Sequence, residues 1–100
     1  MSKSSQVEKI IKYMAKHPTK QWWYAPDFQA RGMEEAYYVG YEASARMSDI
    51  MRMYPTIINI KREGKYRYIQ LRPIKEWSTT IPESIRKMVR EEQTGQKELV

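Results

Sequence analysis

The feature that most constrains the fold is a change of hydrophobic period at Pro55. Before this proline, apolar residues recur every three or four positions, which predicts an amphipathic helix over 43–54. After it, over 56–71, apolar and polar residues alternate, and this predicts β-strands. Because the chain has only 100 residues and carries both patterns side by side, we expect one small α+β domain.

The alternating segment predicts a β-hairpin closed at Glu63-Gly64, where glycine supplies the positive φ that a two-residue turn needs. The pairs in this register are 62 with 65, 60 with 67, 58 with 69 and 56 with 71. They place the aliphatic side chains together on one face, and a slip by one residue would scatter them over both faces. The tip of this hairpin is basic, with Lys61, Arg62, Lys65 and Arg67.

Three elements are expected before residue 43. The pattern from Ser5 to Glu8 predicts a capping box that opens an amphipathic helix, and the next proline ends this helix. The aromatic run over 21–24 predicts a brief strand. A short helix containing Phe28 follows, which Gly32 closes. Residues 33–40 fit either an extra helical turn or an irregular connection.

A last helix is expected after Pro82. Its apolar stripe predicts a homodimer contact, or alternatively a helix that folds back on its own domain. The residues of the stripe are Ile81, Ile85, Met88 and Val89. We therefore divide the chain into a domain over 1–72, an extension with this helix over 73–92 and a flexible tail over 93–100.

Charge and composition narrow the classes of function. The formal net charge is +6, with five lysines against one glutamate in residues 1–20 and five Lys or Arg against Glu63 in residues 61–72. This distribution favours a polyanionic partner. There is no cysteine and one histidine, so we expect no enzyme, no cofactor and no metal site. No apolar run is long enough to span a membrane, and a cytoplasmic protein is expected.

The segment 40–52, followed by 62–68, resembles the recognition helix and wing of small winged helix-turn-helix proteins of phages and bacteria. The matching patterns are Ala45-Arg46-Met47-Ser48-Asp49-Ile50 and Gly64-Lys65-Tyr66-Arg67-Tyr68. The resemblance covers residues 5–72. It implies a three-helix core with a short strand and a β-hairpin wing, to which this chain adds a C-terminal helix. It also implies a small transcriptional or phage regulator that binds double-stranded DNA, with the third helix in the major groove.

The resemblance implies a set of nucleic-acid-binding residues, and the charge of the hairpin tip agrees with it. Cations of the wing would neutralise phosphates and release counterions. We expect Lys20 to add a phosphate contact near the brief strand. The set consists of Tyr41, Ser44, Ala45, Arg46, Ser48 and Arg52 at the helix, and Lys61, Arg62, Lys65, Tyr66 and Arg67 at the wing.

Carboxylates are also expected on the outward face of this helix. At 100° per residue, that face holds Tyr41, Glu42, Ala45, Ser48, Asp49 and Arg52, with Arg46 on its flank. Glu42 and Asp49 either pair with Arg46 and hold its guanidinium away from bases, or Glu42 accepts a hydrogen bond from a cytosine amino group.

Two other functions stay open. The net acidic segment 21–60 suggests a winged helix used as a protein–protein interaction module, an adaptor or inhibitor that docks on an acidic surface of a larger complex. Tyr66 and Tyr68 suggest RNA or single-strand binding by stacking on bases. Paired tyrosines on a strand, however, more often pack within the sheet or against its neighbours.

Overall fold

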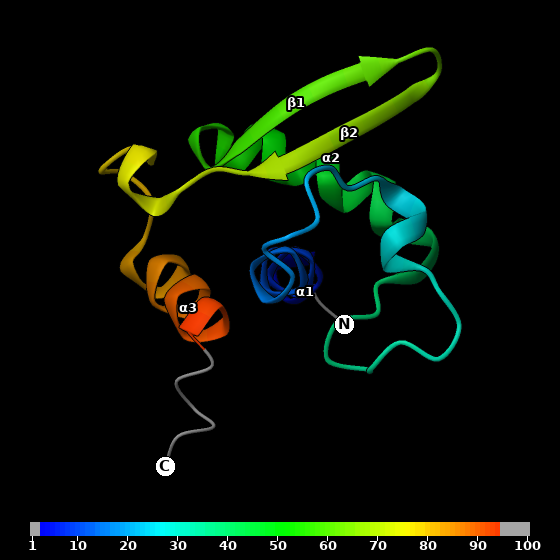
Figure 1. Cartoon of the computed structure of the whole chain (residues 1–100), viewed down its shortest axis with the longest axis horizontal. Coiled ribbons are helices and arrows are strands. Elements are labelled where there is room, and N and C mark those ends of the chain that lie inside the picture. The colour runs from blue at the N-terminus through cyan, green and yellow to red at the C-terminus, as the bar shows by residue number, and fades with distance from the viewer. Residues whose placement is uncertain (1–2, 95–100) are drawn as a thin grey trace.

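The computed structural model describes residues 3–94, in which three α-helices accompany a two-stranded antiparallel sheet (Figure 1). The α-helices are α1 (Lys3–Lys16), α2 (Ala43–Met53) and α3 (Glu83–Thr94). The strands are β1 (Ile58–Glu63) and β2 (Tyr66–Leu71), and the 3-10 turns are η1 (Ala25–Phe28), η2 (Gly40–Glu42), η3 (Pro55–Ile57) and η4 (Ile74–Glu76). The predicted α+β class is confirmed. None of the helices in the described part is long and apolar enough to span a membrane.

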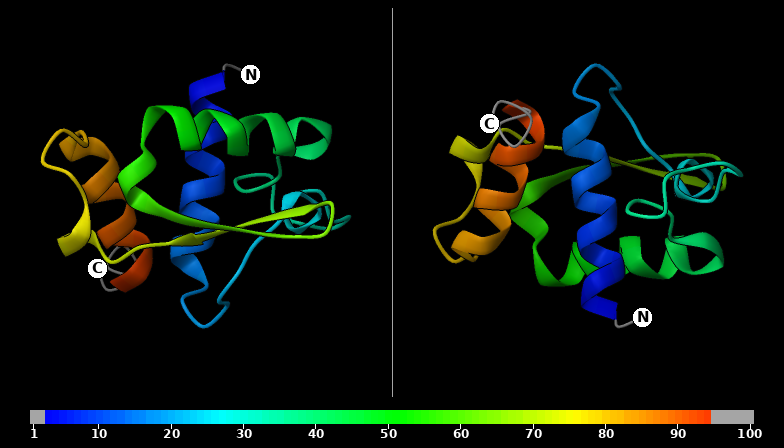
Figure 2. Two further views of the ribbon diagram at one scale, coloured as in Figure 1. Left: turned by 90° about the horizontal axis from the view of Figure 1, so that it is seen from above. Right: turned by 90° about the horizontal axis from the view of Figure 1, so that it is seen from below.

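The core forms around α1, which packs against both α2 and α3. Figure 2 shows α1 running through the middle of the molecule, with α3 beside it and α2 crossing near one of its ends. Each of these helices contributes an apolar stripe because its buried residues recur at helical spacing. The buried side chains of the three stripes are Val7, Ile10, Ile11, Met14 and Ala15 of α1, Ala43, Met47 and Ile50 of α2, and Ile85 and Val89 of α3.

The stripe of α3 folds back on its own domain, which is the second of the two predicted alternatives. Ile81, Ile85 and Val89 are buried in the same core cluster as the residues of α1, and Met88 packs against that cluster. The predicted extension therefore shares the core of the preceding residues. The helix continues to Thr94, beyond the predicted end at 92, and the rest of the predicted tail lies outside the described residues.

The hairpin forms, but its turn lies one residue later than predicted. Gly64, with φ 61°, and Lys65 form the turn, so that Ile60 pairs with Ile69 rather than with Arg67. Side chains alternate with a period of two, and the pattern of aliphatic residues therefore cannot separate registers that differ by two. The backbone takes the register that puts glycine first in the two-residue loop, as a type II′ turn requires.

The predicted strand over 21–24 is reduced to a single bridge. Trp23 N–H donates to the Ile69 carbonyl and Ile69 N–H donates to the Trp23 carbonyl, both at 2.8 Å. The short helix expected at Phe28 is the 3-10 turn η1, and the segment 30–39 holds turns and irregular chain rather than a helix.

The start of α1 also differs from its prediction. It begins at Lys3, so Ser5 lies within the helix and is not its N-cap. No proline or glycine separates Lys3 from Ser5, and the helix extends by half a turn ahead of the predicted capping box.

We predict that Ile69→Ala lowers the free energy of unfolding by about 2–4 kcal/mol, because a fully buried isoleucine leaves a cavity. Its cross-strand partner Ile60 is 47% exposed, and Ile60→Ala is expected to cost less than about 1 kcal/mol. Urea denaturation followed by tryptophan fluorescence measures both variants. Equal losses would contradict the anchoring of the hairpin at Ile69.

Candidate nucleic-acid interface

A groove of about 300 Å³ lies between the hairpin tip, the first turns of α2 and η1. We call it the hairpin groove, and its lining residues are Tyr24, Ala25, Pro26, Ser44, Met47, Arg62, Lys65, Tyr66 and Arg67. It contains three cationic side chains and no carboxylate. The structure thus brings together Ser44 of the predicted helix and most of the predicted wing.

Arg67 ties the hairpin to α2. Its Nη2 donates to the Ser44 carbonyl oxygen at 2.9 Å and to the Ser44 Oγ at 3.4 Å. Burial and the neighbouring guanidinium of Arg62 lower the pKa of Arg67, although an arginine remains charged at neutral pH. Arg67 therefore adds positive charge to the hairpin groove while its hydrogen bonds fix the distance between the hairpin and α2.

Arg62 and Lys65 are the exposed cations of the groove. Within residues 3–94, the side chain of Arg62 forms no hydrogen bond or ion pair, and Lys65 lies over the Tyr66 ring with its Nζ 5.6 Å from the centroid. Like charges in one small groove repel each other, and a bound anion would relieve that repulsion. These two side chains are consequently the ones that the fold leaves available to a ligand.

Lys61 is placed on the other face of the hairpin, away from the groove lining. Its Nζ lies 4.6 Å from the centroid of the Trp22 ring, 5.5 Å from that of Tyr68 and 3.4 Å from Glu63 Oε2. These contacts engage Lys61 within the sheet. The sequence pattern predicts its charge but not its aromatic neighbour Trp22, which comes from the segment before η1.

The hairpin tyrosines pack on Tyr24. The Tyr68 ring stacks on the Tyr24 ring at a centroid distance of 5.3 Å, and the Tyr66 ring meets it edge-on at 6.0 Å. Desolvation raises the pKa of the Tyr68 hydroxyl, and the nearby Glu63 carboxylate adds to the effect. The packing interpretation of Tyr68 is confirmed, whereas Tyr66 remains 49% exposed at the rim of the groove.

The predicted outward face of α2 is wrong at Asp49. This residue and Arg46 are only 6% and 7% exposed, and Asp49 Oδ2 lies 3.0 Å from Arg46 Nε. Glu42 Oε1 approaches Arg46 Nη1 at 3.5 Å, and Asp49 Oδ1 accepts a hydrogen bond from Arg52. Because α1, η1, η2 and η3 all contact α2, the buried face is wider than its apolar stripe.

The remaining predicted residues of α2 are at the surface. Tyr41 is 99% exposed, Ala45 and Arg52 are exposed, and Ser48 is half-buried. None of these side chains lines the hairpin groove. Conversely, sequence analysis missed Tyr24, Ala25 and Pro26, because η1 reaches the groove through the bridge at Trp23, and it missed Met47, because this residue belongs to the apolar stripe of α2.

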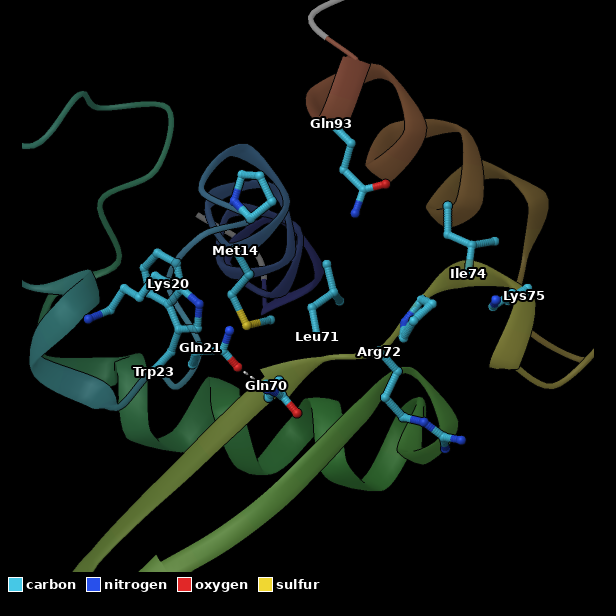
Figure 3. A pocket seen from close by; sticks show the side chains of 12 residues that line it. Met14, Lys20, Gln21, Trp23, Gln70, Leu71, Arg72, Ile74, Lys75 and Gln93 are labelled. Atoms are coloured by element: carbon cyan, nitrogen blue, oxygen red, sulfur yellow. Dashed lines mark hydrogen bonds between the residues drawn. The ribbon is translucent and has the colours of Figure 1, made fainter.

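A larger hollow of about 500 Å³ lies at the base of the hairpin, between the C-terminal ends of α1 and α3 (Figure 3). Three cations line it. Lys20 Nζ is 3.7 Å from Asp27 Oδ1 and Arg72 Nη2 is 3.3 Å from Glu76 Oε1, whereas Lys75 forms no ion pair within residues 3–94. Two of the three cations therefore have a carboxylate partner, and the predicted phosphate contact of Lys20 lies outside the hairpin groove. Among the described residues, no cluster of His, Asp and Glu could hold a metal ion.

We predict that Asp49→Ala lowers the free energy of unfolding by roughly 3 kcal/mol, because it leaves the buried Arg46 guanidinium without its nearest counter-charge. The control is Glu42→Ala, since Glu42 is exposed and its loss from a surface ion pair is expected to cost less than about 1 kcal/mol. Thermal unfolding followed by circular dichroism compares the two. A similar cost for both would show that Asp49 does not hold Arg46 in place.

Comparison with known proteins identifies no relative of this chain from which a function could be proposed. No protein-family model matches the sequence, and no significant similarity is found to a curated protein or to a solved structure. The resemblance to winged helix-turn-helix proteins thus stays an expectation that rests on residues 40–52 and 62–68. What the chain does must be inferred from the charge and shape of the hairpin groove.

Proposed function

We propose that this chain is a winged-helix domain that binds double-stranded DNA, as a small transcriptional or phage regulator. One observation carries the proposal: the hairpin groove gathers three cations, with no carboxylate in its lining, beside the start of α2. The order of α1, the bridge at Trp23, η1, α2 and the hairpin supports the winged-helix layout. In that layout α2 is the recognition helix and the hairpin is the wing.

The groove suits a phosphodiester. Arg62 and Lys65 supply charged donors that no described carboxylate occupies, and each phosphate neutralised releases condensed counterions. Gly64 lies between them with open space around its Cα. Glycine itself brings no side chain, so a backbone phosphate can approach the turn closely at this position.

The position of α2 also suits a duplex. Its first turn, at Ser44, borders the same groove as the basic tip, and Tyr41 just before it is almost fully exposed. A phosphate held at the groove would bring the start of α2 to the adjacent major groove, which is wide enough to admit a helix. Arg67 would act as a positioning residue, since its hydrogen bonds to Ser44 set the spacing of the two contacts.

The protein-docking alternative has less support from the arrangement of charges. It was motivated by the acidic segment 21–60, but most carboxylates there are engaged by cations of the same chain. The ion pairs are Asp27 with Lys20, Glu34 with Lys16, Glu42 with Arg46, and Asp49 with both Arg46 and Arg52. Only Glu35 of that segment forms no ion pair within residues 3–94. The segment therefore presents little unpaired negative charge to a partner.

We predict that Arg62→Glu combined with Lys65→Glu weakens binding to a labelled random-sequence duplex by about 10- to 100-fold, because two phosphate contacts are lost. The slope of log K against log salt should fall by about 2. Fluorescence anisotropy across a salt series measures both quantities. The matched control is Lys75→Glu with Lys87→Glu, two exposed lysines outside the groove whose change lowers the net charge from +6 to the same +2.

The control pair should keep binding within about 3-fold of the original chain, because overall charge acts weakly when the contact is local. Equal losses in both variants would mean that only total charge matters and would contradict a site at the groove. Unchanged binding after the reversal at the tip would refute the wing assignment. No duplex binding even at low salt would refute the proposed function and favour protein docking.

A further inference from the structure

The hydrogen-bond donors on α2 indicate how strongly the chain distinguishes one DNA sequence from another. This inference rests on the proposed function. We infer that the chain binds duplex DNA with little preference for base sequence. Affinity comes from phosphate contacts at the hairpin groove, and α2 fills the major groove without reading base edges.

Sequence is read in the major groove by particular side chains. Arginine or lysine distinguishes guanine, and asparagine or glutamine distinguishes adenine, each through a pair of hydrogen bonds. The sequence of α2 contains no lysine, asparagine or glutamine. Its only long donors are Arg46 and Arg52, so any base discrimination by donation must come from these two guanidinium groups.

Both guanidinium groups are engaged by carboxylates of the same surface. Arg46 is 7% exposed and held between Asp49, at 3.0 Å, and Glu42, at 3.5 Å. Arg52 is exposed, but it donates to the other oxygen of the same Asp49 carboxylate. Withdrawing either arginine would leave Asp49, a nearly buried carboxylate, with fewer partners, and this opposes a switch to base contacts.

The short side chains of α2 add little discrimination. Ser48 Oγ donates to the Ser44 carbonyl oxygen at 3.3 Å, and Ser44 accepts from Arg67. A serine hydroxyl can pair with any base edge, and Ala45 offers only contact with a thymine methyl group, without the paired hydrogen bonds that discriminate strongly. Tyr41 presents its ring at the start of the helix, and its single hydroxyl cannot form the pair of hydrogen bonds that distinguishes guanine or adenine.

Carboxylates do not supply a preference either. Glu42 is the exposed acid at the start of this surface, and its Oε1 faces Arg46 Nη1. A carboxylate that enters the major groove is repelled by the phosphates on both sides. The side chains that remain for affinity are therefore Arg62 and Lys65 on the hairpin, which meet only the backbone and so do not depend on sequence.

A selection from a duplex library with a randomised centre tests the inference. The full chain is mixed with the library, and the bound and unbound fractions are sequenced. We expect affinities spread over less than about 10-fold with no enriched motif, whereas sequence-specific proteins prefer their site by about 1,000-fold or more. A motif enriched to more than about 100-fold over the pool would overturn this inference and leave the proposed function standing. Absence of any duplex binding would overturn both.

A matched pair of variants tests the same inference at single residues. Arg52→Ala should change duplex affinity by less than about 2-fold, while Arg62→Ala should weaken it by about 5- to 10-fold on every sequence. Both replace an exposed arginine, and thermal unfolding shows that each variant is folded. A loss at Arg52 that equals the loss at Arg62, or that varies between duplex sequences, would overturn the inference.

Discussion

The hydrogen-bonded bridge between Trp23 and Ile69 is the interaction on which the rest of the arrangement depends. It is made by two buried residues that exchange reciprocal bonds of 2.8 Å. Trp23 also stacks on Phe28, with ring centroids 5.5 Å apart, and meets the edge of Tyr13 at 5.3 Å. The bridge thereby joins the sheet to α1 and η1. Since Tyr24, Ala25 and Pro26 follow directly in the chain, the same contact sets one wall of the hairpin groove.

Of the basic residues on α2 and the hairpin, some stabilise the fold through contacts within the chain and others form no ion pair within residues 3–94. Arg46 neutralises Asp49 inside α2, Lys61 packs between Trp22 and Tyr68, and Arg67 bonds to Ser44. Each of these groups has its charge compensated or its donors occupied within the chain. Arg62 and Lys65 differ because neither forms an ion pair within residues 3–94, since the adjacent acid, Glu63, pairs with Lys61. The net charge alone is therefore a weak guide to a polyanionic partner. The positions of the cations that form no ion pair within the chain are a better guide.

The period of the hydrophobic residues correctly predicted the elements that bury one face, namely α2 and the hairpin. The stripe around Met47 gave α2, and the alternation around Ile69 gave the hairpin and both of its faces, because each pattern reflects one buried side. The same alternation could not fix the turn at Gly64-Lys65, since two registers sort the side chains identically. The burial of Arg46 depends on how many elements pack around α2, and a helical wheel carries no information about those neighbours. To predict the hairpin groove, one would have to know that Trp23 pairs with a strand more than forty residues later in the chain. No local sequence pattern indicates that contact.

The partial exposure of Ile60 has a consequence for how copies of the chain meet one another. β1 is hydrogen-bonded to β2 on one side only, so its other side is an open edge that a strand from a second molecule could extend. Directly after Ile60 come Lys61, Arg62 and Glu63, and charges on an edge strand oppose such pairing. The charges at the hairpin tip therefore also disfavour pairing between the edge strands of two molecules, which would otherwise form a continuous sheet. Replacing it with apolar residues would turn the same edge into a starting point for aggregation.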